Sequence, residues 1–527
     1  WWWWRASRVI HDVVNGQTNE VIDEFPQFSF LLGDMHPHVL ALPFVLLALA
    51  AALNLLRQKD FPNSQSPIRN SLFTFDFGLL ALIVGALGFL NIWDLPTCAF
   101  VVVIAYALAR LRAAQSGKPW REIIFFALSL GVFAFVLYLP FYLGFQSQAG
   151  GILPVLFIKT RLHQYLLIYG FFVFILGAFV LYLARQIPAR EWLPRALNVA
   201  LAAIGFPLFV GAIGLLVVAL VPVVQDFARS VIPNADNVFS AVLSAYFAPL
   251  LSDPWLYILL ALLLAISGAL LTTRLRADDS IAFVLLLAFT AFLLTFGTEF
   301  VFLRDSFGSR MNSVFKFYFQ AWALLSVAAA YIVYNLARDL RGLARGVWFI
   351  AFALLFGASM AYPALAIPNK ADGFQRAATL DGIEWIRNQS AGDFAAIEWL
   401  KENAPRGAGI VEAVGDDYSY GNRISMATGL PTILGWVGHE LQWRGNTKLF
   451  EDNAAGVNRR ADIARVYQTS DAREALTLLD KYAIKFVVVG AIEKAQYNLS
   501  KTQIEKFGRI LNLVFENGDT RIYARGN

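Results

Sequence analysis

The chain has 527 residues, of which 58% are hydrophobic and only 15% are charged, and its mean hydropathy is positive. A soluble globular domain carries about a quarter charged residues, so this composition excludes that class and indicates a polytopic membrane protein. The net charge of +5 must be compared with membrane topology before it is taken to indicate nucleic-acid binding. The single cysteine, Cys98, excludes an internal disulfide. Because the chain opens on Trp1 without a signal-peptide pattern, we expect a further segment upstream.

Acidic residues and histidines gather near the start of the chain, directly before an apolar run. The stretch 21–38 reads V-I-D-E-F-P-Q-F-S-F-L-L-G-D-M-H-P-H and contains Asp23, Glu24, Asp34, His36 and His38. One interpretation is an interfacial loop whose acids cap a helix and whose histidines face water. The other is an active-site loop at the membrane surface, with Asp34 as the first candidate for a catalytic base and Glu24 or Asp23 as the second.

Three metal-ligand residue types alternate in the same stretch. Asp34, His36 and His38 would lie on one side of an extended segment. Imidazole favours zinc or manganese and carboxylate favours magnesium or manganese, so the set suits a divalent cation such as Mg or Mn. Alternatively, Asp34 or Glu24 acts as a base or as a single ligand of a shared metal.

Ten segments are long and apolar enough to span a bilayer, which takes roughly 20 residues in a helix. They are 38–56, 77–92, 95–111, 123–145, 165–183, 197–221, 255–271, 281–296, 314–333 and 347–362. Trp93 and Asp94 separate the second from the third, where Pro96 favours a sharp turn. No span carries a charge at its middle, which argues against ion transport and for chemistry at a membrane surface.

Lys and Arg residues are distributed unevenly between the loops. The loops after the first, third, fifth, seventh and ninth spans carry fifteen of them, and the loops after the fourth, sixth and eighth spans carry five. The positive-inside rule places the first set of loops in the cytoplasm. We therefore expect a multi-pass protein of the plasma membrane, with the opening acidic stretch, the loops at 159–163 and 299–312 and the whole tail on the external face.

External cations cluster between the eighth and ninth spans. Arg304, Arg310 and Lys316 lie among aromatic residues there, and Arg161 lies in the loop before the fifth span. Arg holds a phosphate through two hydrogen bonds and Lys adds a point charge, so these residues suit the phosphate of a lipid-linked donor. The alternative is an interfacial loop in which Arg304 and Asp305 neutralise each other.

The composition after residue 366 is that of a soluble α/β domain. We expect an external loop at 1–37, a transmembrane domain at 38–366 and an extracytoplasmic domain at 367–527. Periodicity predicts helices at 394–403 and 472–482, strands at 409–412 and 484–489, and a terminal hairpin of 511–515 with 520–524. The sequence has no Gly-rich phosphate loop of the common spacings, so a nucleotide cofactor is not expected.

A polar and aromatic run at 412–445 lies between these strands. Its candidate residues for binding a sugar or an acceptor are Trp436, His439, Glu440, Trp443 and Arg444. Trp beside acids and amides is typical of a sugar site, whereas a loop that docks onto the helical bundle needs similar residues.

Three long motifs carry a resemblance to a known family. They are the stretch 21–44, the run R-D-S-F-G-S-R-M-N-S-V-F-K-F-Y-F-Q-A-W and the run T-G-L-P-T-I-L-G-W-V-G-H-E-L-Q-W-R-G. In this order, the motifs resemble the YYY family of uncharacterised membrane proteins, a family of unknown function found in Chloroflexi and archaea. The tyrosine triplet of that family is absent here, so the resemblance implies that part of the active site lies upstream.

By architecture that family is similar to the GT-C glycosyltransferases. The resemblance implies an α-helical polytopic membrane bundle of about ten spans with a C-terminal extracytoplasmic α/β domain. It also implies transfer of a sugar from a polyprenyl-phosphate-linked donor to an extracytoplasmic glycan or protein acceptor. This likeness is one of fold, whereas function resides in sites. The alternative function is that of a noncatalytic membrane scaffold or a glycan-binding protein of the cell envelope.

Overall fold

The computed structural model describes residues 2–526 apart from 15–16, 34, 59–74, 115–118, 146, 148, 157–158, 233–235, 276–277, 306, 376, 445, 449 and 453. The chain divides into two compact units, Trp1–Gln375 and Arg376–Asn527, and each is described by itself below. The boundary expected at residue 366 falls inside helix α16 (Gly342–Lys370), which belongs to the first unit.

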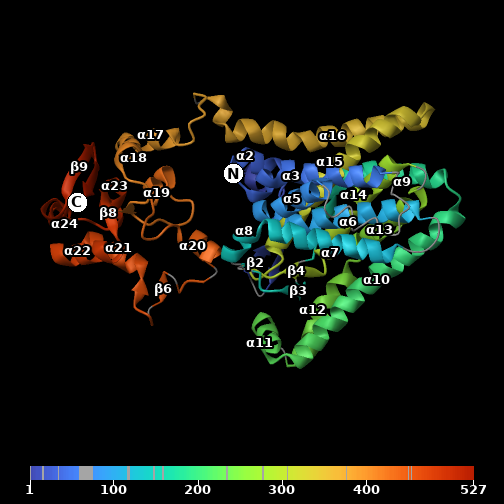
Figure 1. Cartoon of the computed structure of the whole chain (residues 1–527), viewed down its shortest axis with the longest axis horizontal. Helices are drawn as coiled ribbons and strands as arrows, with labels where there is room; N and C mark the ends of the chain where they lie inside the picture. Colours follow the sequence, from blue (N-terminus) through green and yellow to red (C-terminus); the bar gives the residue numbers. More distant parts are fainter. Residues whose placement is uncertain are drawn as a thin grey trace. The chain divides into compact units, whose positions relative to one another are not determined.

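Unit 1 is a bundle of long helices (Figure 1). Among its described residues, nine helices are long and apolar enough to cross a membrane. They are α3 (Pro37–Arg57), α6 (Asp94–Ala113), α7 (Trp120–Leu137), α9 (Leu162–Arg185), α10 (Ala189–Leu220), α13 (Trp255–Arg274), α14 (Asp279–Gly297), α15 (Met311–Asp339) and α16. The second predicted span corresponds to a shorter helix, α5 (Phe75–Leu90), and a turn separates it from α6. The prediction of a polytopic helical bundle is confirmed.

One predicted span is wrong in its length. The segment 123–145 is not one helix, because the chain breaks at Tyr138 into α7 and a short helix, α8 (Leu139–Gly144). Pro140 is the second residue of α8. Proline lacks an N–H and clashes with the preceding turn, so a continuous helix cannot pass through this position without a kink.

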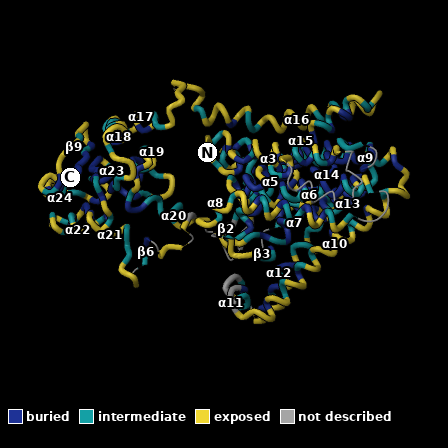
Figure 2. The backbone as a smooth tube through the Cα atoms, viewed as in Figure 1, coloured by how far each residue is buried: buried dark blue, intermediate teal, exposed yellow. Residues whose placement is uncertain are grey.

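Burial is uneven across the bundle. Helix α14 packs against α13, α15 and α6 and is the most buried of the spanning helices. Helices α10 and α16 are largely exposed along their lengths, as Figure 2 shows. Most of their exposed residues between the helix ends are apolar, and such surfaces in a membrane protein are covered by lipid rather than by water.

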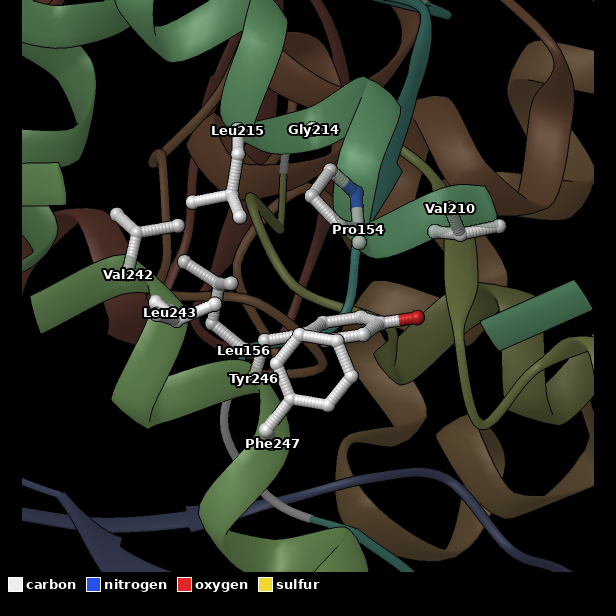
Figure 3. Close-up of a pocket in the computed structure, with 10 residues that line it drawn as sticks. Pro154, Leu156, Val210, Gly214, Leu215, Val242, Leu243, Tyr246 and Phe247 are labelled. Carbon is white, nitrogen blue, oxygen red and sulfur yellow. The ribbon is translucent and has the colours of Figure 1, made fainter. Parts of the chain in front are cut away.

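A short helix covers part of α10. The chain continues through α11 (Pro222–Val231) into α12 (Val238–Ser252), which packs against α10. The Tyr246 hydroxyl donates to the backbone carbonyl oxygen of Pro207 at 3.0 Å, and the Phe247 ring covers Gly211, where a Cβ atom would come within 2.9 Å of it. A small apolar pocket lies at this contact, and Pro154 of β3 (Ile152–Pro154) closes it (Figure 3).

One end of the bundle carries short elements in place of long helices (Figure 1). Strands β1 (His11–Val14) and β2 (Gln17–Glu20) form a hairpin, and α2 (Gln27–Leu32) follows. The loop after α8 pairs with the loop after α14 through β3 and β4 (Val301–Leu303), with Leu153 opposite Phe302. Segments far apart in the sequence therefore meet at this end of the bundle.

Unit 2 is an α/β sandwich around a mixed sheet of order β5-β8-β10-β9. The strands are β5 (Gly409–Val411), β8 (Ile484–Val489), β9 (Asn512–Asn517) and β10 (Thr520–Ala524). Strand β5 runs parallel to β8, whereas β10 is antiparallel to both β8 and β9, with Tyr523 opposite Val487. The predicted strands and the terminal hairpin are confirmed.

Helices cover both faces of this sheet. One apolar core joins α21 (Arg459–Gln468), α22 (Ala472–Lys481) and α24 (Lys501–Ile510) to one face. The other core joins α18 (Ala391–Asn403) and α19 (Arg423–Thr428) to the opposite face, where α17 (Glu384–Gln389) packs against α18. Alternate residues of β8 serve the two cores, since Val487 belongs to the first and Val488 to the second.

A buried arginine ties the elements of unit 2 together. Arg423 is fully buried and donates to Asp393 of α18 at 2.6 Å and to Glu493 of α23 (Ala491–Gln496) at 3.0 Å. Glu412 lies 3.9 Å from the same guanidinium and accepts hydrogen bonds from the first backbone N–H groups of α19. Three carboxylates around one cation keep a charged group tolerable inside an apolar unit.

Candidate functional site

Asp23 lies between β2 and α2, and its side chain is fully buried. Its Oδ2 atom accepts hydrogen bonds from the backbone N–H groups of Val9 and Ile10, both at 3.1 Å. Its Oδ1 atom has no hydrogen-bond partner among the described residues. Burial raises the pKa of Asp23 to about 7, against the opposing effects of these amides and of Arg310. A carboxyl group with this pKa can take up and release a proton near neutral pH.

A buried ion pair in the loop after α14 is hydrogen-bonded to Thr160 in the loop before α9. Arg310 Nη1 donates to Glu299 Oε1 at 2.7 Å, and both side chains are almost completely buried. The Thr160 hydroxyl donates to Glu299 Oε1 at 2.5 Å and accepts from Arg310 Nη2 at 2.9 Å. The backbone N–H of Thr160 donates to the second carboxylate oxygen at 3.0 Å. The Arg310 guanidinium is therefore engaged within the protein and holds the two loops together.

Lys159 lies beside this ion pair. Its ammonium donates to the backbone carbonyl oxygen of Glu299 and lies 5.2 Å from the centroid of the Tyr246 ring. Burial lowers the pKa of Lys159 to about 7, against the raising effect of the Glu299 carboxylate. The pKa values of Asp23 and Lys159, two groups at this end of the bundle, are thus shifted toward about 7 from opposite sides.

Glu24 is paired with an arginine that the sequence did not single out. Arg8 Nη2 donates to Glu24 at 2.5 Å, and the guanidinium lies 3.9 Å from the centroid of the Trp4 ring. Gln164 of α9 donates to the backbone carbonyl oxygen of Val9 at 2.8 Å. These contacts fix the opening segment on the bundle and place Glu24 beside a cation.

The two candidate histidines share one aromatic neighbour. The His36 and His38 rings lie 4.9 Å apart, and both meet the Phe315 ring edge-on. Lys316 Nζ lies 4.4 Å from the centroid of that same ring. His38 is buried, and its Nε2 atom is hydrogen-bonded to the Ser29 hydroxyl at 2.9 Å. His36, at the start of α3, and Lys316, in the first turns of α15, are half-buried, and each lies against the Phe315 ring.

Asp94 joins the same region, although the sequence did not single it out as a site residue. It begins α6, is buried, and accepts a hydrogen bond from Asn91 at 2.9 Å. Lys316 acts electrostatically on Asp94 as well as on His38. Gln320, one helical turn after Lys316, donates to the backbone carbonyl oxygen of Trp93 at 2.8 Å. A second group of polar side chains thus lines the N-termini of α3, α6 and α15.

The remaining predicted cations are exposed. Arg304 follows β4, and its backbone pairs with Gly150 and Gly151 while its side chain extends to the surface. Arg161 is exposed at the start of α9. Asp305 accepts from the Asn312 amide at 2.8 Å and from the backbone N–H of Phe307 at 3.0 Å, which are contacts within its own loop.

The metal site predicted at Asp34, His36 and His38 stays a prediction. Asp34 lies outside the described residues. One nitrogen of His38 is already bonded to Ser29, and the two imidazole rings pack against each other and against Phe315. Within the described part of the chain, no group of three or more His, Cys, Asp or Glu side chains converges as metal ligands do.

The candidate sugar-binding residues belong to unit 2. Trp436 directly precedes α20 (Val437–Arg444), and His439 lies in the first turn of this helix. Their ring centroids are 5.2 Å apart. Glu440 accepts from the backbone N–H of Gly435 at 3.1 Å and pairs with Arg444. The side chain of Trp443 lies outside the described part of the chain.

Sequence reasoning missed several residues of these clusters. Thr160 carries no charge, so nothing in the sequence distinguishes it from other threonines. Arg8 was detectable in principle, because it is the nearest cation before two adjacent acids in one external stretch. Asp94 was detectable as a carboxylate beside a predicted span.

These observations define the class: a polytopic membrane protein with buried charged groups at one end of its bundle. The chain belongs to the family described as uncharacterized membrane protein (DUF2298), whose model matches residues 1–325. This assignment confirms the resemblance that the sequence motifs indicated. No curated protein sequence matches the chain.

The chain also resembles a solved structure. The chain is similar to the archaeal oligosaccharyltransferase AglB from Archaeoglobus fulgidus, solved in complex with an inhibitory peptide and a dolichol-phosphate. The sequence identity is 14% and the TM-score is 0.33. The alignment covers 93% of this chain and 57% of that chain, so this chain spans little more than half the length of that protein.

Proposed function

We propose that this protein is a membrane glycosyltransferase that transfers a sugar from a polyprenyl-phosphate-linked donor to an acceptor outside the cytoplasm. One observation carries the proposal: a buried carboxyl group with a pKa near 7, Asp23, belongs to the end of the bundle where the loops that carry Arg161 and Arg304 and the start of α15 with Lys316 are joined by hydrogen bonds and ring contacts. Glycosyl transfer needs a base for the acceptor hydroxyl and positive charge near the leaving phosphate. Anchoring to headgroups would need neither a buried carboxyl nor this convergence.

Among the acidic residues that the structure describes, Asp23 has the properties expected of the general base. Its raised pKa lets it accept a proton near neutral pH, and one of its oxygens has no partner within the described residues. Glu24 is paired with Arg8 and positions the opening segment. Asp34 stays the first candidate from the sequence, and it lies outside the described residues.

The donor phosphate is held by the exposed and half-exposed cations. Lys316 and His36 share Phe315 as a neighbour, and an ammonium and an imidazole can both donate to phosphate oxygens. Arg304 and Arg161 extend from neighbouring loops at the same end. The Arg310 guanidinium is already shared between Glu299 and Thr160, which supports a positioning role for this residue.

The alternative function is that of a noncatalytic scaffold or a glycan-binding protein. The aromatic rings at the start of α20 favour it, because they occur in unit 2 and need no contribution from the charged end of the bundle. The two functions differ in their requirement for Asp23: a scaffold keeps its biological activity when this carboxyl group is removed.

The test measures transfer of labelled sugar from polyprenyl-phosphate-linked hexose or N-acetylhexosamine in proteoliposomes that contain the full chain. We expect transfer by the wild-type protein and a loss of at least about 100-fold in Asp23→Asn, a typical contribution of a general base. The matched control is Arg341→Ala, an exposed arginine between α15 and α16, which should transfer at the wild-type rate. Equal rates in Asp23→Asn and wild type, or no transfer by the wild-type protein from either donor, would refute the proposal. A parallel reaction with a chelator tests whether a divalent cation such as Mg or Mn is required.

A further inference from the structure

Unit 2 displays three aromatic rings in mutual contact on its surface. The three rings belong to Tyr418, Trp436 and His439. The ring centroid of Tyr418 lies 5.6 Å from that of Trp436 and 4.9 Å from that of His439, and the last two centroids are 5.2 Å apart. We call these three residues the aromatic platform. Tyr418 is 81% exposed, which is unusual for a large side chain that has two aromatic neighbours to pack against.

The chain holds Tyr418 in this exposed position at a conformational cost. Its φ angle is 60°, a left-handed backbone conformation that a bulky residue rarely adopts. The loop that carries it closes on itself at Gly415 and Gly421, whose backbones approach too closely for a side chain on either. Strained residues that persist on a surface are typical of sites that bind something.

Hydrogen bonds fix the platform to the body of unit 2. The Trp436 indole N–H donates to the backbone carbonyl oxygen of Gly421 at 2.9 Å, so the orientation of this ring is set by the closed loop. Asp417 accepts from the backbone N–H of Gly438 at 3.0 Å, which joins the loop to α20. A ring surface that is ordered before binding loses little conformational entropy when a ligand stacks on it.

Polar groups beside the rings indicate what the ligand is. Asp416 and Asp417 are exposed next to Tyr418, and Glu440 pairs with Arg444 beside His439. The apolar faces of a sugar ring stack on aromatic side chains, while its hydroxyl groups donate to carboxylates and accept from arginine. Two exposed acids would instead repel the anionic headgroups of a membrane surface, which argues against insertion of the platform into lipid.

We propose that the aromatic platform of Tyr418, Trp436 and His439 is a carbohydrate-binding site that takes a pyranose ring of a glycan chain. Only the role of that glycan as acceptor rests on the proposed function. Binding itself needs neither the donor nor the charged end of the bundle. The site gives unit 2 a binding function of its own, which is to hold a sugar chain.

Binding of the full chain in detergent to an array of hexose, N-acetylhexosamine and uronic-acid oligosaccharides tests the proposal. We expect the wild-type protein to bind at least one of these classes. Tyr418→Gly should raise the Kd about tenfold, equivalent to about 1.4 kcal/mol, whereas Tyr418→Phe should change it little because the ring remains. Glycine suits the left-handed backbone at this position, so a loss of binding in Tyr418→Gly does not result from misfolding.

Trp385→Ala is the matched control, because Trp385 is a 43% exposed tryptophan of the same unit outside the platform. It should bind as the wild type does. Failure of the wild-type protein to bind any oligosaccharide on the array would overturn the proposal, as would equal binding by Tyr418→Gly and the wild type. Asp23→Asn should bind oligosaccharide as the wild type does even where it no longer transfers sugar. Wild-type protein that binds oligosaccharide but transfers no sugar would refute the proposed reaction alone.

Discussion

Replacing Arg310 with alanine tests whether this arginine is a structural partner of Glu299 or a free ligand for phosphate. The substitution removes one side of a buried ion pair with an N···O distance of 2.7 Å. It also removes the hydrogen bonds to Thr160 at 2.9 Å and to the backbone carbonyl oxygen of Thr298 at 3.2 Å. The Glu299 carboxylate would remain completely buried, with the two Thr160 donors as its hydrogen-bond partners and Lys159 nearby.

Removing one partner of a buried ion pair costs about 3–5 kcal/mol, because the remaining charge is left without compensation. We therefore expect Arg310→Ala to lower the free energy of unfolding of unit 1 by that amount. Neutralising the partner should recover part of the loss. The double variant Arg310→Ala/Glu299→Gln should be more stable than Arg310→Ala by roughly 1–3 kcal/mol, the penalty of an unsatisfied buried group.

The assay is denaturant-induced unfolding of the full chain in mild detergent, followed by loss of helical circular dichroism. Arg341→Ala is the matched control, since Arg341 is exposed, and it should change stability by less than about 0.5 kcal/mol. The reasoning is refuted if Arg310→Ala costs no more than Arg341→Ala, or if the double variant is less stable than the single one.

Four further predictions concern other parts of the chain. Wild-type transfer should increase as the pH rises through about 7, because the base must be deprotonated, and this limb should be absent from the pH profile of Asp23→Asn. The raised pKa of Asp23 also affects stability, because the stability contributed by the protonated carboxyl group is lost as the pH rises through about 7. Asp23→Asn should therefore unfold at a higher denaturant concentration than the wild type at pH 8 but not at pH 5. Arg423→Ala should destabilise unit 2 by about 3–5 kcal/mol in the same unfolding assay, because it leaves buried carboxylates unpaired; a change below 1 kcal/mol would contradict the burial of this cluster. Cysteines introduced at Leu343 and Leu380, both highly exposed, should differ in labelling by an impermeant thiol reagent on intact cells in a Cys98→Ala background. The proposed topology predicts labelling at Leu380 and not at Leu343, and labelling at Leu343 alone would invert it.

Much of the fold could be predicted because it depends on local patterns. Apolar runs of about 20 residues predicted the spanning helices, and a short apolar run predicted strand 484–489 with the bounds that β8 has. The apolar pattern does not indicate the break at Tyr138, because the apolar composition continues through it. Pro140 is a helix breaker, which a pattern of hydropathy alone does not register. The pairing of β3 with β4 was also missed, since both strands have only three residues and lie in separate loops.

The site was predictable in residue type but not in pairing. The sequence showed that Arg310 and Glu299 lie in one loop, yet it gave no means to know that Thr160, 150 residues away from Arg310, would bridge them. The same applies to Asp23: a carboxylate in an external loop is expected to be solvated, and its raised pKa results from burial that only the tertiary structure supplies.

The most direct test of the central claim is an experimental structure of the full chain with a polyprenyl phosphate analogue bound. The account predicts that the phosphate lies beside Lys316 and His36, with Asp23 and the exposed side chains of Arg304 and Arg161 at the same end of the bundle. A phosphate bound at the opposite end, near Arg341, would contradict it. Likewise, an analogue that does not bind at concentrations that saturate other polyprenyl-phosphate enzymes would remove the donor site from this protein.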